Sequence, residues 1–340
     1  MTGSRDFRLN EGTVRFADLV PSRSPFVGSA RGVVEPDTEF SIVESRWTPT
    51  LPHRRLETAS GFAVCGRGRR GAGTCPEYRC SVAEVLIAHT GRWRVSVGDP
   101  GPDTRVEVGA GDVMSVPAGA VRRIELLDEI DGFLFVVRSS VEHGDDVPAI
   151  ATHAVAPHGA LHPICSGHWI DDSGGIPVLR AVRAEDPAAS GSTPEERAAR
   201  WVCTAAAMQA NPNSALASTG VVEADVIGPD VGIGGFSQGP IRADGRHGFC
   251  VRRITLESGA YVPAHRRSEP CAFLIQDGTL EVRSSAEVIL LGAGDVLSMA
   301  PGVEHSLRNT TSRPTCVFVV LGAEDPAAPD FSSHPLPGRG

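Results

Sequence analysis

Hydrophobic and polar positions alternate along this chain in short runs, and glycine or proline separates each run from the next. Successive side chains of a strand point to opposite faces, so an alternation of period two indicates a strand buried on one face. The clearest runs are Val85–Ile87, Trp93–Val97, Leu134–Val137, Phe273–Ile275, Leu280–Val282 and Val317–Leu321. The pattern predicts an all-β protein built from many short strands.

The strand pattern occurs twice. The landmarks Ser60–Phe62 and Gly111–Val113 in the first half match His247–Phe249 and Gly294–Val296 in the second half. From position 60 to 247 the offset is 187, and from 111 to 294 it is 183, so the first copy carries four extra residues around 99–104. A duplicated domain of evenly spaced short strands indicates two barrels of the double-sheet jelly-roll type.

Between the two copies the composition changes to a stretch rich in proline, alanine, histidine and serine. Thr193 has the features of an N-cap, and the proline and glutamate residues that follow it are typical of a first helical turn. We therefore predict one helix at about 194–210. The expected division of the chain is an N-terminal barrel at 1–144, a connector at 145–214, a C-terminal barrel at 215–323 and a flexible tail at 324–340.

Charge and composition exclude several kinds of binding partner and of chemistry. The net charge of −9 gives no attraction to phosphate backbones or anionic lipid, so small molecules are better candidates than nucleic acid or membrane. The sequence contains no lysine, which excludes Schiff-base and P-loop chemistry. The N-terminus lacks the apolar segment of a secretory signal, and the longest apolar run, Cys316–Leu321, is too short for a membrane span. We expect a cytoplasmic pair of barrels, and a homodimer is compatible with the sequence.

Two motifs of the second copy resemble those of a known family. The segment Gly259–Gly278 has the spacing G-x5-H-x-H-x3-E-x6-G, and Gly294–Asn309 has that of the accompanying second motif. Both are similar to the cupins, and the repeat indicates the two-barrel bicupins, which include gentisate and quercetin dioxygenases and oxalate decarboxylase. The resemblance implies two tandem cupin (double-stranded β-helix) barrels joined by a connector with one α-helix. In such cupins three histidines and one glutamate hold a divalent metal in the barrel mouth.

Both barrels depart from this ligand set. The four motif positions are Tyr78, Cys80, Glu84 and Arg122 in the first barrel and His265, Arg267, Cys271 and His305 in the second. The first barrel keeps only the carboxylate, so we expect no cupin-type metal there. Its glutamate and its arginine are expected to form a buried or half-buried ion pair at the former metal position; the alternative is that Arg122 is exposed at a loop.

Three interpretations of the second barrel stay open. In one, His265 and His305 are a general acid and base that titrate near neutral pH, while Arg267, Tyr261 and Cys271 bind the substrate. In another, His265, His305 and Glu269 rebuild a site for one Fe, Ni, Mn or Zn ion. In the third, the barrel is a pocket that binds a small molecule without catalysis.

The leading prediction is an enzyme of specialised metabolism that needs no cofactor. It would act on a small anionic or aromatic substrate by isomerase, cyclase or lyase chemistry in the C-terminal barrel. The alternatives are a metal-dependent dioxygenase with a rebuilt two-histidine site and a small-molecule-binding cupin. Because fold does not determine function, this step depends on the resemblance.

Overall fold

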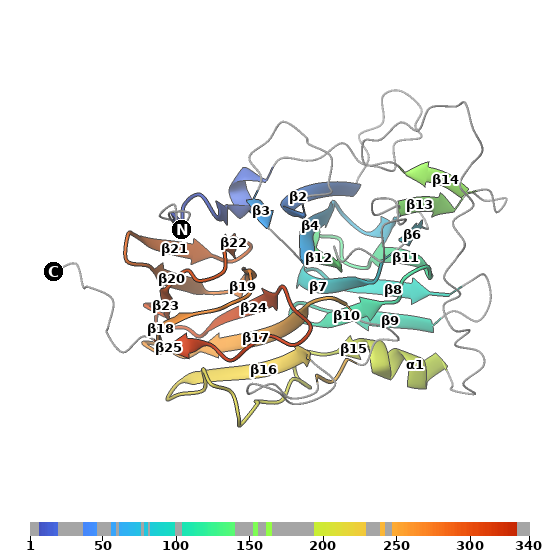
Figure 1. Ribbon diagram of the computed structural model, residues 1–340. Coiled ribbons are helices and arrows are strands. Elements are labelled where there is room, and N and C mark those ends of the chain that lie inside the picture. Colours follow the sequence, from blue (N-terminus) through green and yellow to red (C-terminus); the bar gives the residue numbers. More distant parts are fainter. Residues whose placement is uncertain are drawn as a thin grey trace.

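Two β-barrels lie side by side, each built from two sheets (Figure 1). The structure is a computed structural model, and it describes residues 7–19, 37–45, 56–58, 61–75, 78–80, 82–98, 104–139, 152–155, 161–164, 194–228, 239–241 and 247–331. The predicted all-β class with two tandem barrels is confirmed. All strand pairs in the described part are antiparallel except β2 and β3, which run parallel.

The first barrel has an inner sheet, which faces the second barrel, and an outer sheet. The inner sheet has the order β15 (Val202–Cys203), β10 (Val113–Val116), β7 (Glu84–Thr90), β12 (Gly132–Ser139), β4 (Phe62–Arg69), β2 (Asp37–Ser45), β3 (Leu56–Thr58). The outer sheet has the order β14 (Leu161–Ile164), β13 (Thr152–Val155), β6 (Tyr78–Cys80), β11 (Val121–Leu126), β8 (Trp93–Val97), β9 (Thr104–Val108), and β5 (Gly73–Thr74) also pairs with β11.

The second barrel repeats this plan. Its inner sheet has the order β1 (Thr13–Val14), β22 (Val296–Met299), β19 (Cys271–Asp277), β24 (Thr315–Leu321), β17 (Cys250–Leu256), β16 (Val221–Ile227). Its outer sheet has the order β21 (Val288–Gly292), β20 (Thr279–Arg283), β23 (His305–Arg308), β18 (Tyr261–Arg266), β25 (Asp330–Phe331).

Three hydrophobic layers form the core: one inside each barrel and one between the two inner sheets. Strand β24 contributes to two of them. Val317, Val319 and Leu321 pack inside the second barrel. Phe318 and Val320 pack in the layer between the barrels. Both faces of this strand are buried, so its sequence is a continuous apolar run and not the alternation of a strand buried on one face that was expected for 317–321.

Buried polar contacts also join the barrels. Gln276 Nε2 donates to the Ala88 carbonyl (3.2 Å) and to the His89 carbonyl (3.1 Å). Ser115 Oγ and His247 Nε2 lie 2.8 Å apart. Burial lowers the pKa of His247 to about 4, so this imidazole is neutral at pH 7. The two barrels therefore share a packed interface that has its own hydrogen bonds.

Each inner sheet gains its last strand from a segment outside its own barrel. We call these two segments, residues 13–16 and 202–205, the arms. Strand β1 pairs with β22 of the second barrel, and strand β15 pairs with β10 of the first. Two aspartates fix these arms: Phe16 N donates to Asp295 Oδ1 (2.9 Å), and Ala205 N donates to Asp112 Oδ1 (2.7 Å). The arms cover sheet edges that would otherwise expose unpaired backbone groups.

These contacts correct the predicted domain boundaries. Residues 7–19 add a strand to the C-terminal barrel, and Phe16 also contacts His89 and Phe133 of the first barrel, so this segment is not part of the N-terminal barrel alone. The connector is not a separate unit where the structure describes it, because β13 extends the outer sheet of the first barrel through β6 and carries β14.

The predicted helix is shorter than expected. Helix α1 spans Pro194–Trp201, and the chain continues directly into β15. The expected end at about 210 does not hold, because pairing with β10 and the burial of Trp201 override local helical propensity here. Thr193, the expected cap, lies outside the described residues. No helix in the described part of the chain is long and apolar enough to cross a membrane.

The predicted tail is also corrected in part. Residues 324–331 follow the surface of the second barrel and end in β25, which pairs with β18. The sequence signal was misleading because this segment has few apolar residues, whereas its attachment uses backbone groups and buried prolines at positions 326 and 329. Residues 332–340 lie outside the described part.

Candidate functional site

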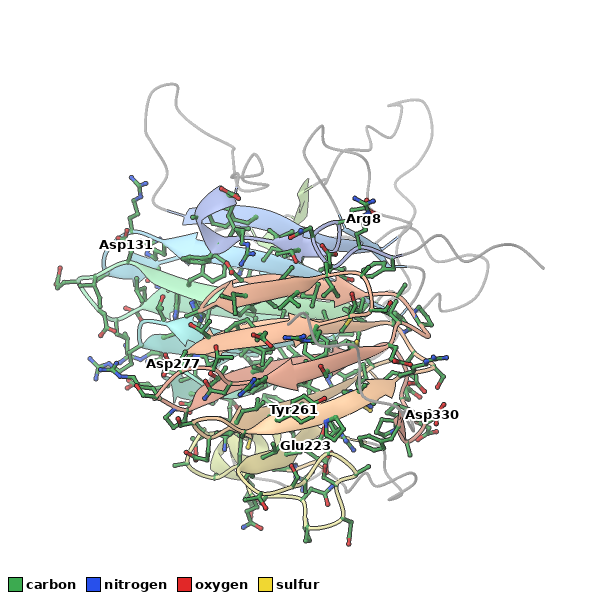
Figure 2. The ribbon with its side chains drawn as sticks, turned by 90° about the vertical axis from the view of Figure 1, so that its left-hand side faces the viewer. Arg8, Asp131, Glu223, Tyr261, Asp277 and Asp330 are labelled. Atoms are coloured by element: carbon green, nitrogen blue, oxygen red, sulfur yellow. The ribbon has the colours of Figure 1, made fainter. Side chains whose placement is uncertain are left out.

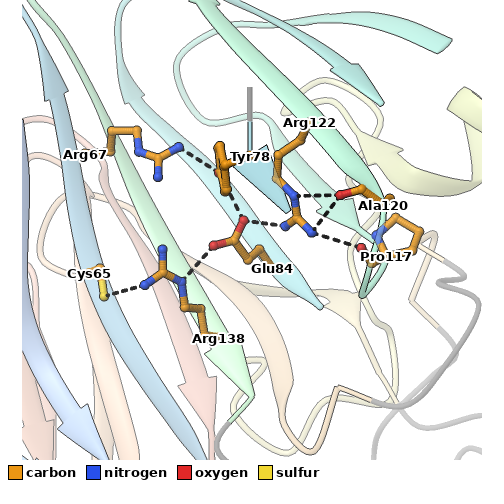
Figure 3. Close-up of polar contacts among 8 residues, drawn as sticks. All are labelled: Cys65, Arg67, Tyr78, Glu84, Pro117, Ala120, Arg122 and Arg138. Carbon is orange, nitrogen blue, oxygen red and sulfur yellow. Dashed lines mark hydrogen bonds and ion pairs between the residues drawn. The ribbon is translucent and has the colours of Figure 1, made fainter. Parts of the chain in front are cut away.

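The motif positions of the first barrel form a buried ion network (Figure 3). Arg122 Nη1 donates to Glu84 Oε2, and Arg138 Nε donates to Glu84 Oε1 (2.7 Å). The Tyr78 hydroxyl donates to Glu84 Oε2 (3.1 Å) and accepts from Arg67 Nη1 (2.7 Å). All of these side chains are buried. The ion pair expected between Glu84 and Arg122 is present in the structure.

Electrostatics keep this network ionised. Burial raises the pKa of Glu84, but the charges of Arg122, Arg138 and Arg67 together lower it by more, so that the pKa is about 2. Burial raises the pKa of the Tyr78 phenol and of the Cys80 thiol, so both stay neutral at pH 7. Both oxygens of the carboxylate are thus used by the protein's own donors.

The second barrel brings two histidines together. Strands β18 and β23 pair antiparallel with His265 opposite His305, and the ring centroids are 4.3 Å apart. A bulge between Val262 and His265 shifts the register, and Pro263, which has no N–H, lies inside it. His265 Nδ1 donates to the Pro263 carbonyl (2.9 Å), and His305 Nδ1 donates to the Val303 carbonyl (3.0 Å). Since a carbonyl only accepts, each Nε2 atom presents a lone pair.

Burial keeps both imidazoles neutral. It lowers the pKa of His265 to about 4, and the Arg267 charge lowers it too, against the hydrogen bond to Pro263. Burial, His265 and Arg267 lower the pKa of His305 well below its usual value. The prediction that both titrate near neutral pH is therefore wrong for the protein without ligand, because neither side chain is in contact with enough water to stabilise a charge.

Arg267 is the third polar group of this site. Its side chain is 4% exposed, and its Nη1 atom has no hydrogen-bond partner in the structure. Burial lowers the pKa of this guanidinium, and among the charged groups around it the Glu223 carboxylate raises that pKa the most. Glu223 itself pairs with Arg252 (2.9 Å), which also pairs with Asp225 (2.9 Å).

The sequence analysis missed this acidic pair and its arginine. A signal was available: two carboxylates occur in the otherwise apolar run Val221–Ile227, and two arginines occur in Cys250–Leu256. Charges in strands that are buried on both faces require partners, and these strands are neighbours in the sheet. No motif covers them, so their relation to Arg267 became visible only in the fold.

The three other predicted site residues, Tyr261, Cys271 and Glu269, do not have the roles predicted for them. Tyr261 is 42% exposed on the outer side of β18, opposite in direction to the buried Val262 (Figure 2). Burial raises the pKa of Cys271 to about 12, and its neutral thiol packs in the core of the second barrel. Glu269 Oε1 accepts from Ala327 N (2.7 Å). The structure supports neither a substrate contact for Tyr261 nor a thiolate at Cys271.

The two barrels differ at their motif positions in a coupled way. In the first barrel Glu84 lies opposite Arg138 in the register, and in the second Cys271 lies opposite Leu321. Replacing the carboxylate by a thiol thus accompanies loss of the facing arginine. His305, at the position of the other arginine, stays neutral. The described polar atoms of the first motif are paired, whereas the second motif retains a buried donor and a buried acceptor without partners.

The fold and these motif positions define a class: two double-sheet barrels in tandem with an incomplete histidine set, that is, a bicupin. Residues 252–321 match the Cupin domain family. This match lies in the second barrel, and the two-barrel fold of the chain is that of a bicupin whose motif positions are degenerate. No curated protein sequence matches it.

Solved structures agree with this fold. The formate complex of the oxalate decarboxylase from Lactobacillus farciminis aligns with a TM-score of 0.58 at 14% identity, over 97% of this chain and 90% of that chain. A mutant of the Bacillus subtilis oxalate decarboxylase gives 0.51 at 16% identity, over 94% and 78%. The salicylate 1,2-dioxygenase from Pseudaminobacter salicylatoxidans gives 0.51 at 13% identity, over 77% and 71%. At these identities the likeness concerns the fold.

The comparisons correct the prediction that no cofactor is needed. The similar structures are metal-dependent cupins, and they point to a metal ion instead of none. The donor set of this chain meets that expectation only in part. His265 and His305 have the fixed orientation and free Nε2 atoms of metal-binding histidines. However, no group of three or more His, Cys, Asp or Glu side chains in the described residues is placed to hold a metal ion, so Glu269 does not complete a triad and the family's ligand set does not fit.

Proposed function

We propose that the second barrel is an enzyme site for a small organic anion. Arg267 would bind the anionic group, and His265 and His305 would accept and return a proton of the substrate. One observation carries this proposal: the buried Arg267 Nη1 atom and the buried His305 Nε2 atom both lack a hydrogen-bond partner. A buried polar atom without a partner is one that a water, an ion or a ligand can satisfy, and here a donor and an acceptor of this kind belong to the same motif.

The proposed chemistry follows from the tautomers. Both Nδ1 atoms donate to backbone carbonyls, so the substrate has to supply the proton for an Nε2 atom. An imidazole with a pKa near 4 is a weak base in the free protein. An anion bound at Arg267 offsets that positive charge and raises the pKa of both histidines toward neutrality. Proton transfer of this kind serves isomerase, cyclase or lyase reactions.

A second candidate is a metal-dependent oxygenase, and the histidine pair favours it. The backbone carbonyls orient both rings so that their Nε2 atoms are available, which is the usual arrangement of histidines that bind a metal. Elemental analysis of protein purified without an affinity tag or chelator decides between the two candidates. About one iron, nickel, manganese or zinc ion per chain, lost in His265→Ala and in His305→Ala, would favour the oxygenase.

Ligand binding tests the leading proposal. Calorimetry with small carboxylates, from acetate to benzoate, should identify an anion that also raises the melting temperature of the wild type. Arg267→Gln should weaken this binding by about a hundredfold, since a buried charge pair is lost. The matched control is Arg266→Gln, because Arg266 lies next in sequence but is exposed and pairs with Glu304 (2.6 Å). Equal anion affinity in Arg267→Gln and wild type would refute the anion site.

A further inference from the structure

The chain returns over the second barrel after its last core strand. Beyond β24, Glu324 anchors this segment: Gly248 N donates to Glu324 Oε1 (3.1 Å), and Cys250 Sγ donates to the Glu324 carbonyl (2.9 Å). Pro326 and Pro329 are buried against the barrel, and the residues between them are exposed. We call residues 325–331 the strap.

The strap ends on the histidine pair. In the pairing of β25 with β18, Phe331 lies opposite His265 and Asp330 lies opposite Arg266. The ring centroids of Phe331 and His265 are 5.8 Å apart. Phe331 is 39% exposed, whereas His265 and His305 are each 1% exposed. The exposed phenylalanine ring therefore contacts the buried ring of His265, and Figure 2 shows the neighbouring Asp330 at the margin of the barrel.

Few bonds hold the strap closed. Its strand has two residues, and two-residue strands contribute little stability. Between the anchor and this strand, Ala327 N donates to Glu269 Oε1 (2.7 Å), and Ser268 Oγ donates to the same oxygen (2.9 Å). The second oxygen of Glu269 is buried without a hydrogen-bond partner. The bond from the Ala327 amide to this partly buried carboxylate is charge-assisted, which makes it stronger than a bond between neutral groups.

We propose that the strap opens and closes over the histidine pair, with Phe331 as its cover and Glu269 as its latch. Opening at the end beyond Pro326 would expose His265 while Glu324 keeps the strap attached. What passes through the opening rests on the proposed function, namely a small organic anion. The opening itself is independent of that function, and so is the role of Glu269, which acts here through the strap and not on a ligand.

Chemical modification of histidine tests the strap without any substrate. Diethyl pyrocarbonate acylates neutral imidazole, and both histidines are already neutral at pH 7, so the rate reports their accessibility. The rate at His265, followed by peptide mass spectrometry, should rise about tenfold or more in Phe331→Ala. It should rise similarly in Glu269→Ala, because a hydrogen bond to a charged group contributes about that factor. Glu269→Gln keeps one carbonyl acceptor and should react at an intermediate rate.

Two controls accompany these variants. Leu290→Ala removes an exposed apolar side chain of similar size from β21, at the opposite edge of the same sheet, and should react like the wild type. His247, which is buried between the barrels, serves as an internal control for folding and should stay unmodified in every variant. Amide hydrogen exchange at Ala327 should accelerate in Glu269→Ala.

The outcomes separate the two proposals. Unchanged rates at His265 in both Phe331→Ala and Glu269→Ala, with His247 protected, would overturn the strap. Faster modification together with no anion binding to wild type would support the strap and remove the proposed function. Faster modification together with a faster association of the bound carboxylate in calorimetric or stopped-flow measurements would support both.

Discussion

Replacing Glu84 by glutamine removes the carboxylate that pairs with Arg122 and Arg138 in the first barrel. The pKa of this carboxyl lies at about 2 instead of 4.5, because Arg122 and Arg138 outweigh its burial. That shift corresponds to roughly 3 kcal/mol of stability near pH 7. In other proteins, removing one partner of a buried ion pair lowers the free energy of unfolding by about 3–5 kcal/mol. We therefore expect Glu84→Gln to lower the free energy of unfolding by about 3–5 kcal/mol near pH 7.

The pH dependence supplies the stricter test. The folded-state pKa of Glu84 lies below the unfolded-state value, so its stabilisation is complete above about pH 4.5 and is lost as the pH falls toward 2. Urea titrations of wild type and variant should differ most near neutral pH and converge in acid. The control Glu107→Gln breaks an exposed pair with Arg94 and should cost under about 1 kcal/mol. If Glu84→Gln lowers the free energy of unfolding by no more than Glu107→Gln does, or by the same amount at every pH, the reasoning is refuted.

Three further predictions concern the site, the turns and the arms. Methanesulfonate stays ionised in acid, and the affinity of the second barrel for it should rise as the pH falls from about 7 toward 4 and then level off. The reason is that a bound anion raises the pKa of His265, which is about 4 in the free protein. Calorimetry at several pH values measures this affinity. Gly278→Ala should destabilise the protein more than Gly302→Ala in urea titrations: both glycines have positive φ, but only at Gly278 would a Cβ meet backbone atoms, within 2.8 Å. Asp295→Ala should accelerate amide exchange in residues 13–16 and leave 202–205 unchanged, whereas Asp112→Ala should do the reverse.

The sequence predicted the motif positions well and their surroundings poorly. Glu84 and Arg122 could be paired in advance because both occupy positions that the family motif brings to one point. Arg138 comes from a strand with no motif, and so its contribution was not visible. The acidic partner of Arg267 was missed for the same reason: Glu223 belongs to a strand that meets the motif only through sheet order.

Protonation could not be predicted from spacing either. Two histidines at motif positions suggest groups that titrate near neutral pH, since that is the property of an exposed imidazole. The strap and the core remove both rings from water, and desolvation then dominates over every other influence on their pKa values. The residue that covers His265, Phe331, lies in a segment whose composition predicts a frayed end. A two-residue strand has no periodicity by which it could be recognised.

The two arms belong to the internal repeat, although a comparison of the two halves of the sequence does not detect them. Residues 13–14 pair with 296–297, and residues 202–203 pair with 113–114. The paired barrel residues are equivalent at the offset of 183, so the arms are equivalent to each other as well. Residues 13–16 and 202–205 nevertheless share no amino acid in this alignment, because backbone pairing to an edge strand constrains side chains weakly. Each repeat therefore consists of an arm and a barrel, and each arm docks on the other repeat's barrel. Neither barrel has a complete inner sheet without the other half of the chain, so each half of the chain is a structural part of the other's barrel.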